Sequence, residues 1–521
     1  MIKVPVILMV LAAVLAMAGG AAGAPKRGDT VLTLDFEGPD ALKGFTVTGA
    51  GVRLEAGPTG GKVLVVECTA GASPLAANAA MAVPIADFRG CKLDLSARVK
   101  AENVSARPQD WNGIKFMTPI DSPGGRQWPQ APLDVGTFDW RLVTWQASVP
   151  DDATAITLIL GLEQVTGKVW FDDVKITVRR APIVLPTPVP GKPVYKGHTL
   201  PRLRGAMVST EIDEDGLRVL GQEWKANLIR WQLCGFKPKE GISLETYDAV
   251  LEENLKKLDR ALPLCEKYGL MVVVDLHTAP GEGPSGKGLF NDPACQKKFV
   301  EAWDRMARRY KNAKAVWGYD ILNEPVETSV APGLSDWQEL AEKAARAIRA
   351  VDPDRAIIIE PTGWGSPEAL RDLRPMDVPN VVYSVHMYMP HKFTHQGVYD
   401  DGAVKYTYPG VVDGKKWDRA ALEAALKPAV DFQKAYGVHL YLGEFSAIRW
   451  APDGSAARYL RDCIDIFESH GWDWSYHAFR EWQGWSAEHG DDKADTAPAA
   501  QPPERQKILR EWYAKNEKPR W

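Results

Sequence analysis

The stretch Val316-Trp-Gly-Tyr-Asp-Ile-Leu-Asn-Glu-Pro325 decides the fold, because an apolar run that predicts a buried β-strand ends within it, just before Asn323. Seven similar runs lie elsewhere after residue 202, and the segments between them carry apolar residues at helical spacing. This alternation is typical of repeated βα units and a parallel sheet. The eight expected strands are residues 203–209, 226–233, 270–277, 316–322, 356–360, 381–388, 439–445 and 472–482.

The segments between these runs predict amphipathic helices. For example, Leu251, Leu255, Leu258 and Leu262 share one helical face, with charged residues on the opposite face. Eight parallel strands with helices between them close most naturally into a barrel. We therefore predict an α/β fold, a (β/α)8 TIM barrel, over residues 202–521.

The first third of the chain has a different pattern. Short alternating runs such as Lys62-Val-Leu-Val-Val-Glu-Cys68 are separated by Gly, Pro and Asp, which predicts an all-β jelly-roll sandwich over residues 28–180. Residues 181–201 contain Ala181-Pro-Ile-Val-Leu-Pro-Thr-Pro-Val-Pro190, whose prolines favour an extended polyproline conformation. This segment is the expected linker between the sandwich and the barrel.

The N-terminus has the pattern of a secretory signal. Lys3 precedes an apolar run, and the small residues Ala22-Gly23-Ala24 close it, so we expect residues 1–24 to be a signal peptide and the protein to be secreted or periplasmic. Pro25 is a poor residue to follow a cleavage site, so an uncleaved membrane anchor is the alternative. No later stretch is apolar enough to span a bilayer, and no other membrane partner is expected.

The composition excludes several classes of protein. Hydrophobic residues at 45% and charged residues at 25% are ordinary values for a globular protein. A net charge of −4, without a long run of Lys or Arg, gives no basis for binding nucleic acid. The 19 tryptophans outnumber the 14 phenylalanines and 15 tyrosines, and flat indole faces suit both sugar rings and a large core.

The cysteines predict no metal site, because they lack the close CxxC spacing of structural zinc ligands. In an exported protein Cys68 and Cys91 are candidates for a disulfide, but buried free thiols are the expected state. The six cysteines are Cys68, Cys91, Cys234, Cys265, Cys295 and Cys463.

Two glutamates stand at the ends of apolar strands. Functional residues of a barrel gather where the C-terminal ends of its strands meet. Glu324 follows the fourth expected strand, and Glu444 ends the seventh, in Tyr441-Leu-Gly-Glu-Phe-Ser446, on the opposite side of the barrel mouth. Hydrolysis of a glycosidic bond requires such a pair: one carboxyl protonates the leaving oxygen, and the other attacks the anomeric carbon or activates water. The alternative is a pair of solvated or ion-paired structural acids.

The motifs around these glutamates, Asn323-Glu324-Pro325 and Gly443-Glu444-Phe445, resemble those of glycoside hydrolase family 5, a family of retaining cellulases and mannanases built on a (β/α)8 barrel. The resemblance spans essentially all of residues 203–521. It implies that Glu324 is the acid/base and Glu444 the nucleophile. It also implies carboxyl groups about 5 to 5.5 Å apart and a covalent glycosyl-enzyme intermediate.

The resemblance assigns supporting roles to residues of strands two to four. Asn323 matches the residue that binds the sugar 2-hydroxyl, and its alternative is a turn asparagine before Pro325. Arg230, in Leu228-Ile-Arg-Trp231, matches the arginine that keeps the nucleophile ionised, although a structural ion pair would give the same sequence. His277 matches a histidine that contacts the sugar at the cleavage point, with a structural histidine as the alternative.

Strands six and eight supply the remaining expected site residues. His386 and Tyr388 are two residues apart and therefore point the same way from their strand. The resemblance implies that His386 orients the acid/base and that the Tyr388 hydroxyl binds the nucleophile. Trp482 matches the indole platform beneath the sugar, and a core tryptophan is its alternative. No metal or other cofactor is expected at this site.

The long segment 389–417 after strand six is expected to shape the substrate cleft, because it exceeds the usual length of a βα loop. Three tryptophans that follow barrel strands are expected either to stack on substrate or to pack in the core. They are Trp364, Trp450 and Trp485.

The first domain resembles carbohydrate-binding or galactose-binding-like jelly rolls in its opening Leu34-Asp-Phe-Glu37 and its closing Val169-Trp-Phe-Asp-Asp-Val174. Asp35, Glu37 and Asp172 are candidates for a structural calcium site, with solvated loop acids as the alternative. Four tryptophans are candidate sugar contacts or core residues, namely Trp111, Trp128, Trp140 and Trp145.

From these patterns we expect a secreted, retaining, endo-acting β-glycanase whose partner is a β-linked polysaccharide or oligosaccharide. The first expected substrate is β-1,4-glucan, as for a cellulase, and the second is β-mannan. An exo-acting β-glycosidase is one alternative, in which segment 389–417 would close one end of the cleft. A non-catalytic polysaccharide-binding protein is an alternative of another class.

Overall fold

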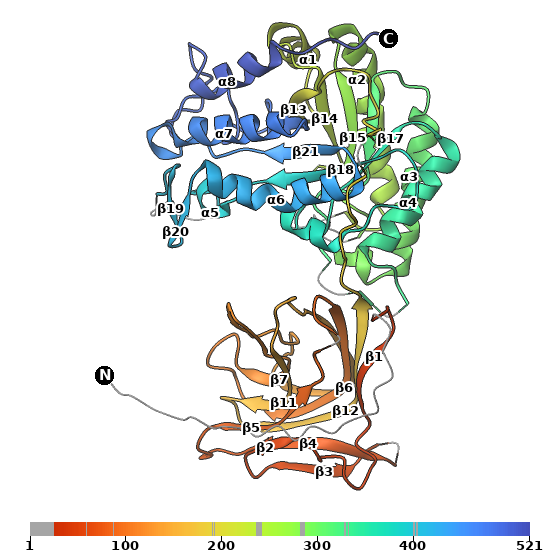
Figure 1. The fold of residues 1–521 in the computed structure, drawn as a ribbon, viewed down its shortest axis with the longest axis vertical. Helices are drawn as coiled ribbons and strands as arrows, with labels where there is room; N and C mark the ends of the chain where they lie inside the picture. The colour runs from red at the N-terminus through yellow and green to blue at the C-terminus, as the bar shows by residue number, and fades with distance from the viewer. Residues whose placement is uncertain are drawn as a thin grey trace. The chain divides into compact units, whose positions relative to one another are not determined.

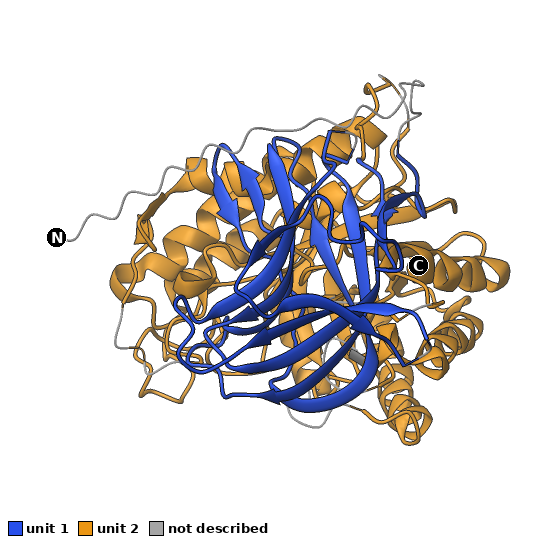
Figure 2. Cartoon of the chain, turned by 90° about the horizontal axis from the view of Figure 1, so that it is seen from below, with its two compact units in different colours: residues 1–182 blue, residues 183–521 orange. Residues whose placement is uncertain are grey.

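The computed structural model describes residues 25–521 except 59, 87, 190, 192, 236–241, 282–286, 328–329, 332, 400–401 and 403–404. The predicted signal peptide, residues 1–24, lies outside the described residues. The chain divides into two compact units, residues 1–182 and 183–521, which Figure 2 shows in blue and orange.

The first unit contains, over its described residues, two six-stranded antiparallel sheets. One sheet has the order β10-β6-β12-β4-β3, with β1 paired to β12. Its strands are β1 (Thr30–Leu34), β3 (Val52–Ala56), β4 (Lys62–Cys68), β6 (Lys92–Val104), β10 (Gly136–Ser148) and β12 (Gly167–Arg180). The other has the order β2-β5-β11-β8-β9, with β7 paired to β11. Its strands are β2 (Thr46–Thr48), β5 (Ala76–Val83), β7 (Gly113–Met117), β8 (Ile120–Ser122), β9 (Gly125–Gln127) and β11 (Ala155–Glu163).

The core of this unit lies between the two sheets, because alternate residues of each strand point to the same face. In β6, for instance, Leu93, Leu95 and Ala97 are buried and the residues between them are partly exposed. Trp145 belongs to this core, where its ring meets Phe116 of the other sheet edge-on at 5.6 Å. The structure thus confirms a sheet-rich first unit with a core between two antiparallel sheets, and its assignment as a jelly roll stays a prediction.

The acidic residues considered for calcium have other hydrogen bonds in the structure. Asp35 accepts from the Glu37 backbone N–H, and Glu37 accepts from the Lys62 backbone N–H at 3.1 Å. Asp172 is buried and accepts from the Asp173 backbone N–H. In the described part of the chain these acids do not form a cluster of three candidate ligand side chains. Calcium binding there stays a prediction.

The second unit is a closed barrel of eight parallel strands, counted over the described residues (Figure 1). All eight predicted strands are confirmed, although the last is shorter than expected. The strands are β13 (Arg204–Ser209), β14 (Leu228–Leu233), β15 (Met271–Leu276), β16 (Val316–Asp320), β17 (Ala356–Ile359), β18 (Val381–Met387), β21 (Leu440–Phe445) and β22 (Asp473–Tyr476).

Helices surround most of this barrel (Figure 1). The long ones are α2 (Tyr247–Tyr268), α3 (Pro293–Tyr310), α4 (Trp337–Val351), α6 (Arg419–Tyr436), α7 (Ser455–Ser469) and α8 (Glu504–Tyr513). The short ones are α1 (Glu214–Arg218), α5 (His391–Thr394) and the helical turns η1 (Val219–Glu223), η2 (Lys287–Phe290), η3 (Pro367–Asp372) and η4 (Pro452–Gly454). The predicted leucine face of α2 is buried. Between β17 and β18 the connection contains the short turn η3 instead of a long helix.

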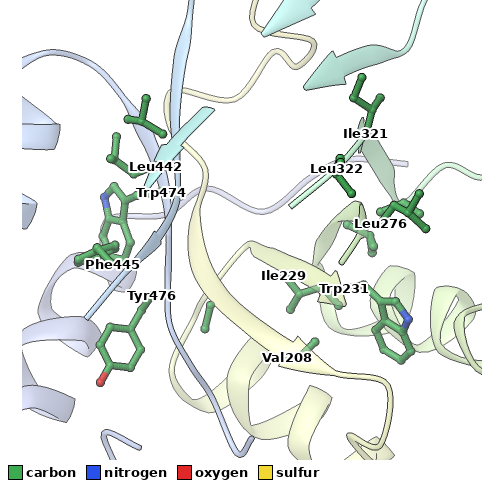
Figure 3. Close-up of a cluster of buried hydrophobic side chains, with 14 of the residues drawn as sticks. Val208, Ile229, Trp231, Leu276, Ile321, Leu322, Leu442, Phe445, Trp474 and Tyr476 are labelled. Carbon is green, nitrogen blue, oxygen red and sulfur yellow. The ribbon is translucent and has the colours of Figure 1, made fainter. Parts of the chain in front are cut away.

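Side chains on the outer face of the barrel pack in a large core with the helices. Figure 3 shows Ile229 and Trp231 of β14 and Trp474 of β22, which are all fully or almost fully buried. A smaller cluster fills the interior of the barrel and includes Leu228 and Tyr441. Inward and outward layers alternate along each strand, so a polar residue on the inner face is directed at the barrel axis.

The end of the predicted linker packs against the barrel. Tyr195 donates a hydrogen bond from its hydroxyl to the Asp354 carbonyl at 2.6 Å, and Trp317 donates to the Lys196 carbonyl at 2.9 Å. The His198 ring contacts the Asp473 carboxylate at 2.7 Å, at the start of β22. These contacts assign residues 195 to 198 to the barrel unit, where they lie at the N-terminal end of the strands.

Two further sequence predictions concern cysteines and membrane spans. All six cysteines are buried and free, which is the state that we expected for them. Among the residues that the structure describes, no helix has the length and apolar character needed to cross a membrane.

Asp473 anchors this N-terminal end of the barrel. It is completely buried, and its Oδ2 lies 2.7 Å from the Nε2 atoms of both His198 and His439. Its other oxygen accepts the Leu203 backbone N–H at 2.8 Å. Burial would raise the pKa of Asp473, but the two imidazoles outweigh burial and hold that pKa well below its usual value.

We expect Asp473→Ala to lower the free energy of unfolding by about 3–5 kcal/mol, because it leaves two buried imidazoles without their acceptor. Urea denaturation near neutral pH measures this loss. In the wild type, the contribution of Asp473 to the free energy of unfolding is fully present above the unfolded-state pKa of Asp. It is lost as the pH falls towards the depressed pKa of Asp473 in the folded state. Asp377→Ala is the matched control, since the Asp377 side chain is 92% exposed. Equal, small losses in both variants would contradict the role given to Asp473.

Candidate active site

The C-terminal ends of the barrel strands surround a cavity of about 720 Å³. Six of the eight predicted site residues line it, namely His277, Asn323, Glu324, His386, Tyr388 and Glu444. Arg230 is completely buried and contacts the cavity residues from below. The structure therefore brings together side chains from five different strands or the loops that follow them.

A bulge directs Glu444 into the cavity. Tyr441 of β21 already points into the barrel, and a residue three positions later would normally point out. The pairing of β18 with β21 shifts by one residue at this place, since Val385 pairs with Leu442 and His386 with Glu444. The extra residue is Gly443, where a Cβ atom would lie 2.8 Å from His386 Nε2. Glycine is thus required for the bulge that aims Glu444 inward.

Glu324 follows β16 in an unusual backbone conformation. Its φ is 43°, in the left-handed region that side chains other than glycine rarely adopt. Its backbone N–H donates to Glu360 Oε2 at 2.8 Å, and its own Oε1 lies 2.9 Å from His386 Nδ1. Contacts at both the backbone and the carboxyl group therefore hold Glu324 in this conformation.

The two glutamates approach each other closely. A carboxyl oxygen of Glu324 lies within 4.8 Å of one of Glu444, with the His386 ring contacting both. Inverting glycosidases need about 6.5–9.5 Å between their carboxyl groups to admit a water molecule, whereas retaining enzymes have about 5–5.5 Å. The separation here matches the retaining geometry.

Arg230 is the centre of a buried charge cluster. Its guanidinium contacts four carboxylates and also donates to Asn323 Oδ1 at 3.0 Å. The four are Asp275 at 3.0 Å, Asp320 at 2.9 Å, Glu360 at 3.0 Å and Glu444 at 2.7 Å. One guanidinium with five donors thus orients the side chains of four strand ends in a site without solvent.

The cluster gives the two glutamates opposite protonation preferences. Burial would raise the pKa of Glu444, but the positive charges of His386, His477 and Arg230 outweigh burial and lower it. Burial also acts on Glu324, and there His386 does not compensate fully, so the pKa of Glu324 is raised. One carboxyl group is therefore kept ionised and the other is favoured as an acid, which is the division of roles that acid-assisted nucleophilic displacement needs.

His386 connects the two glutamates to a third acid. Its Nδ1 contacts Glu324, and its Nε2 lies 3.0 Å from Glu360 Oε1. Burial would lower the pKa of His386, but Glu360 and Glu444 outweigh it, so the pKa is raised well above the usual histidine value. A protonated His386 donates to one oxygen of Glu324 and leaves the other oxygen to carry the acid proton.

The structure differs from the sequence prediction at Trp482. Strand β22 ends at Tyr476, so Trp482 lies in the following loop, is 40% exposed, and packs edge-on against Trp450 and Trp485. Trp482 is not among the residues that line the cavity, and its role as the platform beneath the sugar stays a prediction. The residue that directly follows the strand and faces the cavity is His477, whose Nδ1 lies 2.7 Å from the Tyr388 hydroxyl oxygen.

Other residues of the site were not predicted from the sequence. Asp275, Asp320 and Glu360 are completely buried acids at strand ends that pair with Arg230 beneath the cavity, and their inward position on apolar strands was the available signal. His391 and His395 come from the long segment after β18, where their rings stack at 3.9 Å, and both line the cavity. Burial and the nearby His391 lower the pKa of His395 to about 3, so this ring is neutral.

The structure also shows which residues of the long segment after β18, and which of the three barrel tryptophans, line the cavity. His391, His395 and Tyr399 line the cavity, so the segment after β18 shapes it, as expected from its length. Trp364, which is 55% exposed, and Trp485 line the cavity as well. Trp450 instead donates a hydrogen bond to the Gln396 carbonyl at 2.8 Å and packs against Trp482.

Two groups of described residues have three potential metal ligands each: His198, His439 and Asp473, and Glu324, His386 and Glu444. In the first group both imidazoles contact the same carboxylate oxygen at hydrogen-bond distance. In the second group the side chains bind one another and Arg230. Hydrogen bonds therefore explain why the three side chains of each group lie so close together.

Two glutamates with opposite pKa shifts that face each other across the mouth of a (β/α)8 barrel have the arrangement of a glycosidase. The profile of the family described as "Cellulase (glycosyl hydrolase family 5)" matches residues 191–483. The chain therefore belongs to glycosyl hydrolase family 5 and is a retaining glycoside hydrolase.

Curated relatives agree with this family. The chain is 32% identical to Endoglucanase C of Acetivibrio thermocellus over 255 residues, which cover 43% of this chain and 73% of that protein. It is 26% identical to Cellodextrinase A of Ruminococcus flavefaciens over 234 residues, covering 43% and 67%. Among solved structures, the endoglucanase Cel5A from Thermotoga maritima aligns with a TM-score of 0.46 and 22% identity over 59% of this chain and 96% of that one.

The opposite pKa shifts predict the pH dependence of hydrolysis. Activity needs Glu444 ionised and Glu324 protonated, so kcat/KM rises through the low pKa of Glu444 and falls through the raised pKa of Glu324. With an aryl β-glycoside that has a good leaving group, we expect the kcat/KM profile of Glu324→Ala to lose its alkaline limb. The reason is that the leaving group of this substrate departs without protonation by an acid. The measurement is kcat/KM across pH for both enzymes. An unchanged alkaline limb in Glu324→Ala would assign it to another group.

Proposed function

We propose that this protein is an endo-β-1,4-glucanase that cleaves its substrate by double displacement. The observation that carries this proposal is the pair Glu324 and Glu444, which lie within 4.8 Å of each other with opposite pKa shifts. The names of the curated relatives, which include several endoglucanases, support β-1,4-glucan as the substrate class.

In the first step the Glu444 carboxylate attacks the anomeric carbon. The glycosidic C–O bond breaks as the new C–O bond to Glu444 forms, and Glu324 transfers its proton to the leaving oxygen. Arg230 and Tyr388 contribute by holding the two oxygens of Glu444, at 2.7 Å and 2.9 Å respectively. Their hydrogen bonds keep the nucleophile ionised and aligned for attack.

In the second step a water molecule releases the sugar from Glu444. Glu324, now ionised, accepts a proton from this water as it attacks the anomeric carbon. His386 supports both states of Glu324, because its Nδ1–H donates to Glu324 Oε1 at 2.9 Å whether the other oxygen carries a proton or not. Asn323 lines the cavity and is held by Arg230, which suits it to bind a sugar hydroxyl next to the bond that breaks.

We further propose that the protein acts outside the cell, where a polymeric substrate is accessible. The apolar N-terminal sequence supports this location. The alternatives of an exo-acting β-glycosidase and a β-mannanase share the same chemistry, so substrate tests have to distinguish them.

The substrate prediction is that the full chain releases reducing sugar from carboxymethyl cellulose or mixed-linkage glucan. A panel with glucomannan, galactomannan and xylan tests the alternatives, and Glu444→Gln provides a blank of the same size and shape. Hydrolysis of galactomannan alone would replace the glucanase by a mannanase. Release of monosaccharide or disaccharide without a fall in viscosity would indicate exo-action, and no hydrolysis in the panel would contradict the proposal.

The nucleophile prediction uses chemical rescue. We expect Glu444→Ala to lose activity by at least about 10⁴-fold, since no group replaces the nucleophile. Azide is then expected to restore turnover of an activated aryl β-glycoside and to give the α-glycosyl azide, because a single displacement inverts the anomeric carbon. NMR spectroscopy of the product identifies its configuration. A β-glycosyl azide, or failure of rescue in a folded variant, would argue against Glu444 as nucleophile.

A further inference from the structure

Two titratable groups of the cavity take no direct part in the bond-making and proton-transfer steps of the double displacement described above. His477 and Glu481 both come from the loop after β22, and both line the cavity. Neither residue was predicted from the sequence. Their geometry relative to Tyr388 and Glu444 indicates what they do.

The His477 ring lies between a hydroxyl and a carboxylate. Its Nδ1 is 2.7 Å from the Tyr388 oxygen, and its Nε2 is 3.6 Å from Glu481 Oε2. Tyr388 has a single hydroxyl proton and donates it to Glu444 Oε2 at 2.9 Å. The tyrosine oxygen must therefore accept from His477 Nδ1–H, which sets the proton on that nitrogen.

The surroundings of His477 favour a positive charge. With Nδ1 protonated, Nε2 faces the Glu481 carboxylate, and a proton on Nε2 completes the imidazolium. Burial would lower the pKa of His477, but Glu444 and Glu481 outweigh burial and raise it. The pKa of Glu481, which burial would raise, is in turn lowered by His477, so each group favours the charged form of the other.

One carboxylate oxygen of Glu481 accepts no hydrogen bond from the described residues. Its Oε2 is buried and lacks a hydrogen-bond partner among the described residues, and the 3.6 Å to His477 exceeds hydrogen-bond distance. A buried carboxylate oxygen without a donor is unfavourable. The Glu481 side chain as a whole is 23% exposed and lines the substrate cavity, so a hydroxyl group of the substrate is a suitable donor to this carboxylate, and a hydrogen bond to a charged acceptor is a strong one.

The position of Glu481 identifies the sugar that it would contact. The His477 ring contacts both carboxylates, because its Nδ1 lies 3.9 Å from Glu444 Oε2 and its Nε2 lies 3.6 Å from Glu481 Oε2. Glu444 and Glu481 thus flank one imidazole and line one cavity. The sugar that Glu444 attacks is therefore the one placed to meet Glu481.

We propose that Glu481 is a substrate-binding residue, which accepts a hydrogen bond from a hydroxyl of the sugar that Glu444 attacks, and that His477 is a positioning residue, which joins Glu481 and Tyr388 to that nucleophile. The inference rests on the proposed glycosidase chemistry and adds to it a source of selectivity. A sugar that lacks the hydroxyl, or presents it with the other configuration, leaves the buried carboxylate unpaired and is disfavoured.

The first test compares two glutamates of the same loop. Glu481→Gln keeps the shape and removes the charge, and we expect kcat/KM on the preferred β-glucan to fall roughly 10- to 100-fold. Glu488→Gln is the matched control, because Glu488 pairs with Arg480 at 3.0 Å and does not line the cavity. It should stay within about twofold of the wild type. A Glu481→Gln enzyme with the wild-type kcat/KM would overturn the sugar contact.

The second test separates positioning by His477 from a merely structural role. Loss of the imidazolium in His477→Gln removes a positive charge beside Glu444, so we expect the acid limb of the kcat/KM profile to move to higher pH. A uniform loss at every pH, without movement of the limb, would overturn the positioning role. Other charged or titratable groups face this pair from the surrounding elements, namely Tyr388, Glu444, Glu324, His395 and His277.

The third test needs no activity and therefore distinguishes failure of this inference from failure of the proposed function. Long-range ¹H–¹⁵N spectra of the wild-type imidazoles report the protonation of His477, with His477→Gln to assign its signal. We expect both ring nitrogens of His477 to stay protonated at pH values above the usual histidine pKa. In Glu481→Gln we expect His477 to lose its second proton at a lower pH than in the wild type. A neutral His477 at slightly acidic pH would overturn the positioning role of a charged His477, even if the protein hydrolyses no β-glycan at all.

Discussion

The rest of the site depends on one buried interaction, the guanidinium of Arg230 among four carboxylates. A carboxylate in a protein interior is strongly disfavoured unless a cation and hydrogen bonds compensate for the lost water. Arg230 provides both for Glu444, at 2.7 Å, and it reaches Glu360 with another of its nitrogens. Because the guanidinium is planar and rigid, it also sets the relative position of the strand ends that carry these acids.

The acid and the nucleophile differ through their distance from this cation. Glu444 contacts Arg230 directly, whereas Glu324 is linked to it only through Glu360 and His386. Burial acts on both carboxyl groups, but positive charge overcomes burial at Glu444 alone. A single charge cluster thus produces two opposite protonation states a few ångströms apart, as a double displacement requires.

The sequence indicated the regular parts of this molecule because they depend on local patterns. Apolar runs separated by amphipathic helices are sufficient to predict eight parallel strands, and a glutamate at the end of such a run has few structural explanations. Six predicted residues, among them Glu324 and Glu444, do line one cavity. The strand around residues 472–482 was predicted too long, since its apolar residues after Tyr476 belong to a packed loop and not to the barrel.

By itself, then, the sequence determined the βα alternation, the two-unit organisation and the pair of opposed glutamates, all of which follow from spacing along the chain. Only the tertiary structure decided which loop residues reach the cavity. His477 faces it while Trp482 packs against Trp450, and Glu360 is joined to Arg230 across 130 positions of sequence. The physical reason is that protonation and orientation depend on distances in space between charged groups, and those distances are set by barrel closure and by the bulge at Gly443, not by neighbours in the chain.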